Sequence, residues 1–185
     1  MLLLSFGLLL FCVSHLSIAV VPTLAERRKE GPIKGAVALL NLTGMALIVF
    51  GWRSAEVQWL YALPPVVTHL ALTLIVVAVY LIVSASRPSR LKRVLRHPQL
   101  TGVFLWAVAH LLLNGDTRSL LLFGTLATWT LVEMLVINRR DGVWVRPEAP
   151  PLSTDLATAA VALVVLAVLI WAHPWFTGMP VTLPG

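Results

Sequence analysis

The stretch that decides the fold runs from Arg96 to Asp116 and reads RHPQLTGVFLWAVAHLLLNGD. Pro98 suits the first turn of a helix, because its missing N–H costs no hydrogen bond there. Asn114-Gly115 is a turn signal. The apolar segment between them has about 15 residues, or about 22 Å of helix, which is short for a bilayer core of about 30 Å. We therefore predict a short membrane helix with His97 and Asp116 near opposite faces and His110 inside.

The composition of the whole chain places this helix in a membrane protein. The 185 residues are 58% hydrophobic and only 12% charged, and their mean hydropathy is +0.89, which is too apolar for a soluble domain. A net charge of +6 could suggest a nucleic-acid partner. We exclude one, because the basic residues lie in short loops between apolar runs, where membrane topology explains them. The single cysteine, Cys12, excludes an internal disulfide and a cysteine-based metal cluster.

The apolar runs predict an all-α fold: one domain over residues 1–185, formed by a bundle of about six transmembrane helices. No basic residue precedes the first run, as a signal peptide would require, so we expect that run to be retained as a helix. Breaker and turn residues separate the runs. The expected spans are 2–21, 35–52, 65–84, 98–113, 118–137 and 154–173.

The basic residues orient the predicted bundle. With six spans, the odd loops hold twelve of the fourteen Lys and Arg residues, and the even loops hold only Arg53 and Arg118. Because loops rich in Lys and Arg stay in the cytoplasm, this asymmetry predicts that both termini lie on the outer, periplasmic side. Dropping one span would scatter the basic residues over both faces.

Three local patterns carry further expectations about these helices. Trp52, Trp59 and Tyr61 lie around a turn and suit an interfacial aromatic belt. Thr154-Asp155 is expected to cap the last helix. The second span supplies small residues for close helix contact, namely Gly35, Ala38, Gly44 and Gly51.

Five polar side chains fall inside the predicted spans: His15, Asn41, His69, His110 and Glu133. Ionisable residues in a bilayer are costly and mark either a function or a buried partner. For Glu133 we favour a structural role, in which it extends to the membrane surface and pairs with Arg139-Arg140. For Asn41 we favour a hydrogen bond between helices. His97 and His173 are interpreted as structural or surface groups at the membrane boundary.

His15 and His110 together allow a sharper hypothesis. Imidazoles on two facing helices can hold haem iron at the centre of a bundle. Their ligand nitrogens would then lie about 4 Å apart, for an iron–nitrogen distance near 2 Å. His69 competes with His15 as the partner of His110, and the spacing in the sequence leaves both pairs open.

The motifs of the chain together resemble the NnrU family. The central motif comprises Arg96-His97-Pro98, Gly102, Trp106, Ala109-His110, Asn114-Gly115-Asp116 and the LLLFG run at 120–124. The opening FCVSH at 11–15, followed by Glu26-Arg27, is similar to the first helix and loop of that family, and HPWFTG at 173–178 resembles its closing motif. The likeness spans nearly the whole chain.

This resemblance implies a bacterial inner-membrane, multi-pass protein associated with denitrification and nitric oxide metabolism. The same superfamily includes the plastid zeta-carotene isomerase, which carries haem b on axial histidines; by motif, these match His15 and His110. The resemblance therefore implies haem b as a cofactor. Nothing in the chain indicates a carotenoid pocket, so haem binding transfers more safely than the isomerase reaction.

Two functions from different classes follow, and the sequence leaves open whether the chain is an enzyme. In the first, it is an isomerase-like haem enzyme that acts on an apolar substrate in the bilayer, with catalytic residues undetermined. In the second, it is a non-catalytic accessory protein for the assembly or activity of a nitric oxide reductase, with His97 and the basic loop as a docking face. A transporter ranks third, because we find no internal repeat.

Overall fold

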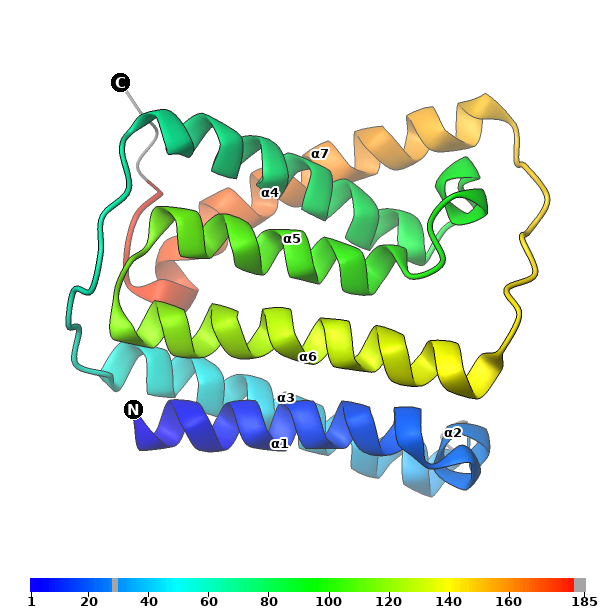
Figure 1. Ribbon diagram of the computed structural model, residues 1–185, viewed down its shortest axis with the longest axis horizontal. Coiled ribbons are helices and arrows are strands. Elements are labelled where there is room, and N and C mark those ends of the chain that lie inside the picture. The colour runs from blue at the N-terminus through cyan, green and yellow to red at the C-terminus, as the bar shows by residue number, and fades with distance from the viewer. Residues whose placement is uncertain (28–29, 182–185) are drawn as a thin grey trace.

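The computed structural model describes residues 1–27 and 30–181, and this part of the chain contains helices and no strand. Arg28 and Lys29, which the charge argument counts, lie outside the described residues. The helices, labelled in Figure 1, are α1 (Leu2–Val20), α2 (Pro22–Arg27), α3 (Gly31–Ser54), α4 (Val66–Ala85), the 3-10 helix η1 (Arg90–Arg93), α5 (Pro98–Leu113), α6 (Thr117–Asp141) and α7 (Leu152–Thr177).

The all-α prediction is confirmed. Among the described helices, α1, α3, α4, α6 and α7 are long and apolar enough to cross a membrane, and α5 is a shorter apolar helix of 16 residues. At the helical rise, α5 is about 24 Å long. It begins and ends at the predicted residues, because Pro98 occupies its first turn and Asn114 after it is extended. The central segment is thus set by its own local signals.

The six apolar helices among the described residues pack in the order α3, α1, α6, α5, α4, α7, and α7 also touches α3 (Figure 1). α1 begins and α7 ends at the same end of the bundle. We call this the terminal end; it also holds the connections 55–65 and 114–116. The opposite end, called the basic end, holds the connections 86–97 and 142–151. The assignment of the basic end to the cytoplasm stays a prediction from the charges.

Close helix contact depends on glycine, but at only some of the predicted positions. A Cβ atom at Gly51 would collide with the backbone of Leu4, and one at Gly44 would lie 3.3 Å from the carbonyl oxygen of Gly7. These contacts join α3 to α1, as small residues do between membrane helices. Gly35 has open space around it and Ala38 is exposed, so the expectation was wrong for both.

Gly102 makes the corresponding contact between α5 and α4. A Cβ atom there would lie 2.8 Å from the carbonyl oxygen of Ala78 and 2.7 Å from Ile82 Cγ1. We expect Gly102→Ala to destabilise the protein by about 1–3 kcal/mol, the usual effect of overpacking. Thermal unfolding in detergent measures this. Gly124→Ala is the matched control, because the nearest atom to its Cβ is 4.0 Å away; an equal loss in both variants would contradict the steric explanation.

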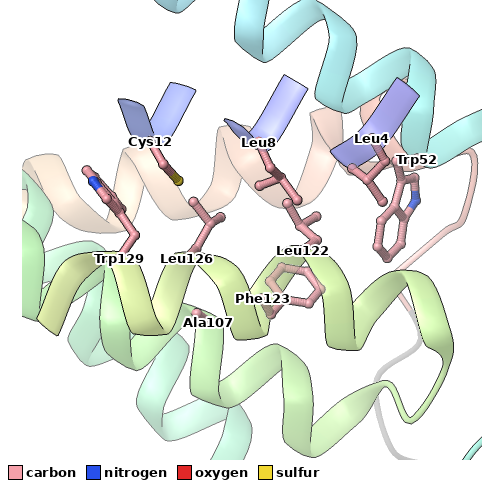
Figure 2. Close-up of a cluster of buried hydrophobic side chains, with 9 residues drawn as sticks. All are labelled: Leu4, Leu8, Cys12, Trp52, Ala107, Leu122, Phe123, Leu126 and Trp129. Atoms are coloured by element: carbon pink, nitrogen blue, oxygen red, sulfur yellow. The ribbon is translucent and has the colours of Figure 1, made fainter. Parts of the chain in front are cut away.

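The buried core lies where α1, α3, α5 and α6 meet (Figure 2). Its side chains are Leu4, Leu8, Cys12, Trp52, Ala107, Leu122, Phe123, Leu126 and Trp129. Trp52 is only 5% exposed, so its assignment to an aromatic belt was wrong; its indole instead packs at 5.9 Å against the ring of Phe123. Trp59 and Tyr61 remain exposed at the terminal end, where a belt would lie.

The start of α7 also differs from the expectation. α7 begins at Leu152 after Pro151, with no side-chain cap. The Asp155 carboxylate accepts a hydrogen bond from Ser89 Oγ at 2.7 Å and another from the backbone N–H of Arg90 at 3.2 Å. The carboxylate therefore joins α7 to η1, and the predicted cap was wrong because partners from another helix occupy its oxygens.

Candidate functional site

His110 lies in the last turn of α5, enclosed by aromatic rings. Its Nδ1 is 2.8 Å from the carbonyl oxygen of Trp106. Its ring stacks on Phe123 at 4.5 Å and lies 4.7 Å from the ring of Trp106. Because a carbonyl oxygen only accepts, Nδ1 carries the proton and Nε2 keeps its lone pair. The imidazole is therefore held in the tautomer that can bind a metal through Nε2.

His15 has the same arrangement on α1. Its Nδ1 donates to the carbonyl oxygen of Phe11 at 2.9 Å, and its ring packs at 4.3 Å against Phe11 and at 5.2 Å against Trp129. The neighbouring Ser14 donates its hydroxyl proton to Asn41 Oδ1 on α3. Asn41 thus forms the hydrogen bond between helices that the sequence predicts. As in His110, this hydrogen bond favours the neutral tautomer in which Nε2 is the metal-binding nitrogen.

The two imidazoles contact different turns of α6. His110 packs on Phe123 and His15 on Trp129, and six residues of helix between these rings correspond to about 9 Å along the axis. The buried side chain of Leu126 lies between Phe123 and Trp129 (Figure 2). Two imidazoles on one iron would need their nitrogens about 4 Å apart. The structure therefore places both histidines beside α6, against rings that are six residues apart on that helix.

Glu133 lies one turn beyond Trp129 and differs from its predicted pairing. Its side chain is buried, with 9% of the residue exposed, and its Oε2 has no hydrogen-bond partner among the described residues. Arg140 instead binds Asp141 at 2.7 Å and donates to the carbonyl oxygens of Ile18 and Ala19 at the end of α1. The predicted pair with Arg139-Arg140 was wrong, because Arg140 finds nearer partners at the membrane boundary.

An apolar groove of about 680 Å³ runs along α6 beside α1. Its lining comes from Cys12 and Leu16 on α1, from Leu60, and from a stripe of α6 that extends from Thr117 to Val132. Trp129 belongs to this lining and its ring also packs against His15, although His15 itself does not line the groove. Sequence reasoning missed the groove. The only available signal was the small side chains that share one face of α6, Gly124, Thr125 and Thr128.

The Asn114-Gly115-Asp116 motif organises the terminal end. Asp116 is 2% exposed and caps α6: its Oδ1 accepts from the backbone N–H groups of Arg118 and Ser119, at 3.1 and 3.0 Å. The carbonyl oxygen of Gly115 accepts from the N–H of Leu60 at 2.7 Å. The hydroxyl of Tyr61 donates to the carbonyl oxygen of Leu111 at 2.6 Å. The motif therefore ties the 55–65 connection to the junction of α5 and α6.

Charge at this end is also buried. Tyr61 is exposed overall, but partial desolvation and, as a smaller effect, the Asp116 carboxylate raise the pKa of its hydroxyl, which favours the protonated, donating form. Arg118 Nε lies 3.6 Å from Asp116 Oδ1, and its guanidinium stacks 4.3 Å from the ring centroid of Trp52. The sequence identified Arg118 only as a loop charge. Its burial depends on Trp52, which is distant in the chain.

The remaining motif residues are structural. Arg96 donates to the carbonyl oxygen of Gly142 at 2.8 Å, and His97 Nε2 donates to Asn138 Oδ1 at 2.9 Å. Pro98 and Trp106 pack within the bundle. His69 is exposed on α4, and His173 Nδ1 donates to the carbonyl oxygen of Met179 at 2.9 Å. Within residues 1–27 and 30–181, no three His, Cys, Asp or Glu side chains gather into a metal site.

Apolar helices long enough to cross a bilayer, polar groups held between them and basic connections at one end define a multi-pass, all-helical membrane protein. Comparison with protein families identifies it further. A family model described as NnrU protein matches residues 3–181, nearly the whole chain, and the chain belongs to the NnrU family. Neither the curated proteins nor the solved structures contain a match.

Proposed function

We propose that this NnrU-family protein binds haem b in the inner membrane of a bacterium, with His15 as an iron ligand and His110 as the second candidate ligand. The observation that carries the proposal is the hydrogen bond of each Nδ1 to a backbone carbonyl, at 2.9 and 2.8 Å. Histidines that bind metals usually donate their other ring N–H in this way. Both side chains also lie among apolar and aromatic neighbours, where a porphyrin would be shielded from water.

The donor chemistry of each histidine supports haem binding, and their contacts with rings six residues apart on α6 favour a single ligand over a shared iron. Of the two, His15 is better placed to bind alone. The groove that its neighbour Trp129 lines has a volume of about 680 Å³, within the range of about 300–1,000 Å³ that is usual for ligand and cofactor sites. Trp129 lines that groove, and none of its lining residues comes from α5. We therefore propose His15 as the single protein ligand and keep His110 only as the alternative ligand.

Haem, when bound, supplies an iron centre that can exchange electrons and bind small molecules. The residues of the chain orient the ligand: the carbonyl oxygen of Phe11 holds the tautomer of His15, and the rings of Phe11 and Trp129 limit its rotation. The apolar groove lining excludes water. This lining is what favours an apolar substrate, as in the isomerase-like hypothesis, over a purely accessory role in denitrification.

The test is the absorption spectrum of the protein purified from cells supplied with haem. The wild type should show a Soret band, His15→Ala should lose most of it, and His110→Ala should keep it. His69→Ala is the matched control, because this histidine is exposed on α4. Size-exclusion chromatography confirms that each variant is folded. A colourless wild type, or an unchanged His15→Ala spectrum, would overturn the proposal. Equal loss in both single variants would overturn the single-ligand assignment.

A further inference from the structure

A second cavity, unrelated to the histidines, lies at the basic end of the bundle. It has a volume of about 410 Å³ and is lined by Arg90, Arg93, Val94, Arg146 and Ala149. The first three belong to η1 and the residue that follows it, and the last two belong to the connection between α6 and α7. Segments about 50 residues apart in the sequence therefore bring three arginine residues to the lining of one cavity.

This cavity is built by specific contacts. Ser89 Oγ donates to Asp155 Oδ1 at 2.7 Å, which fixes η1 to the first turn of α7. Arg90 Nε donates to the carbonyl oxygen of Pro150 at 3.0 Å and lies 3.9 Å from Asp155 Oδ2. The backbone of η1 and one of the three guanidinium groups are thus held in place before any ligand binds.

The charges around the cavity are not balanced. Asp155 neutralises Arg90, but Arg93 and Arg146 form no hydrogen bond or ion pair with any residue that the structure describes; the guanidinium of Arg146 lies 5.4 Å from the ring centroid of Trp144. Glu148 is close in sequence but does not line the cavity. Like charges held together repel one another unless an anion lies between them. Guanidinium groups match phosphate oxygens in geometry and charge.

We propose that this cavity binds the phosphate group of an anionic phospholipid. η1 follows α4 and precedes α5, and Arg146 precedes α7, so the cavity lies at the ends of membrane helices, where lipid head groups lie. Val94 and Val145, which follow Arg93 and precede Arg146 in the sequence, are exposed, as suits a membrane surface but not a cavity for a soluble anion. Basic pockets between membrane helices commonly hold anionic lipid head groups.

Native mass spectrometry of the full chain in detergent tests the proposal, with added dioleoyl phosphatidylglycerol as the anionic probe and dioleoyl phosphatidylcholine as the zwitterionic one. Each arginine near a membrane surface contributes about fivefold to the affinity for an anionic lipid. Arg93→Gln/Arg146→Gln should therefore bind phosphatidylglycerol roughly 25-fold more weakly than the wild type. Lys34→Gln/Arg139→Gln, which removes the same charge from exposed positions outside the cavity, should bind it as the wild type does.

Three results would overturn the proposal. Equal losses in the two double variants would show that net charge alone attracts the lipid. Equal affinity of the wild type for the two lipids would show that the acyl chains, not the head group, are recognised. Displacement of phosphatidylglycerol by millimolar inorganic phosphate would identify a soluble phosphate as the ligand.

Discussion

Replacing Asp116 with alanine is expected to destabilise the protein by about 3–5 kcal/mol, because it leaves the charge of Arg118 buried without its partner. The Asp116 side chain is 2% exposed and that of Arg118 is 9% exposed, and Arg118 Nε lies 3.6 Å from Asp116 Oδ1. The substitution also removes the cap of α6. The Asp116 carboxylate accepts hydrogen bonds from two backbone N–H groups and from the hydroxyl of Ser119. Both losses act at the same helix start.

Thermal and denaturant unfolding in detergent measure this effect. Asp141→Ala is the matched control, because it breaks the ion pair between Asp141 and Arg140. The side chain of Arg140 is 29% exposed and that of Asp141 is 46% exposed, and such surface pairs contribute at most about 1 kcal/mol to stability. The double variant Asp116→Ala/Arg118→Met should recover part of the stability, because no buried charge remains. A single Asp116→Ala variant as stable as the control would show that Arg118 does not depend on this carboxylate.

Replacing Gly115 with alanine is expected to have the second largest effect, about 3 kcal/mol or more. The new Cβ atom would collide with the carbonyl oxygen of Tyr61. That backbone cannot move aside without cost, because the N–H groups of Leu60 and Tyr61 both donate to the Gly115 carbonyl oxygen, and Thr117 N–H donates to the carbonyl oxygen of Gln58. Each lost bond costs about 1 kcal/mol. The substitution therefore detaches the 55–65 connection from the start of α6.

Two measurements check the Gly115 prediction. The melting temperature in detergent should fall relative to Gly35→Ala, where an added Cβ has nothing within 4 Å. Cleavage after Glu56 by a glutamate-specific protease should become faster, because the connection is no longer held against residues 115–117. An unchanged cleavage rate together with an unchanged melting temperature would mean that the terminal end can accommodate the side chain.

The sequence determined the features that depend on local chemistry. Long apolar runs must form helices in a bilayer, because every backbone N–H and C=O has to be bonded within the chain. Pro98 and Asn114 then set both ends of α5. Asp116 caps α6 by accepting hydrogen bonds from the backbone N–H groups of Arg118 and Ser119, which lie two and three residues further along the chain. The hydrogen bond of Asn41 to the first helix also follows from one polar group in an apolar span.

Only the tertiary structure decided which way the side chains face. An amphipathic stripe in the sequence identifies the buried side of a helix in a soluble protein. A membrane helix is apolar all round, so its hydrophobic pattern does not identify the side that faces other helices. The side of a helix that faces its neighbour is set instead where small residues let two backbones approach. The contact of Gly51 with Leu4 joins α1 to α3 in this way, and Trp52, the next residue along α3, is buried. For the same reason His15 and His110 meet different turns of α6. Helix order, which no single segment encodes, placed the groove along α1 and α6 and kept α5 out of its lining.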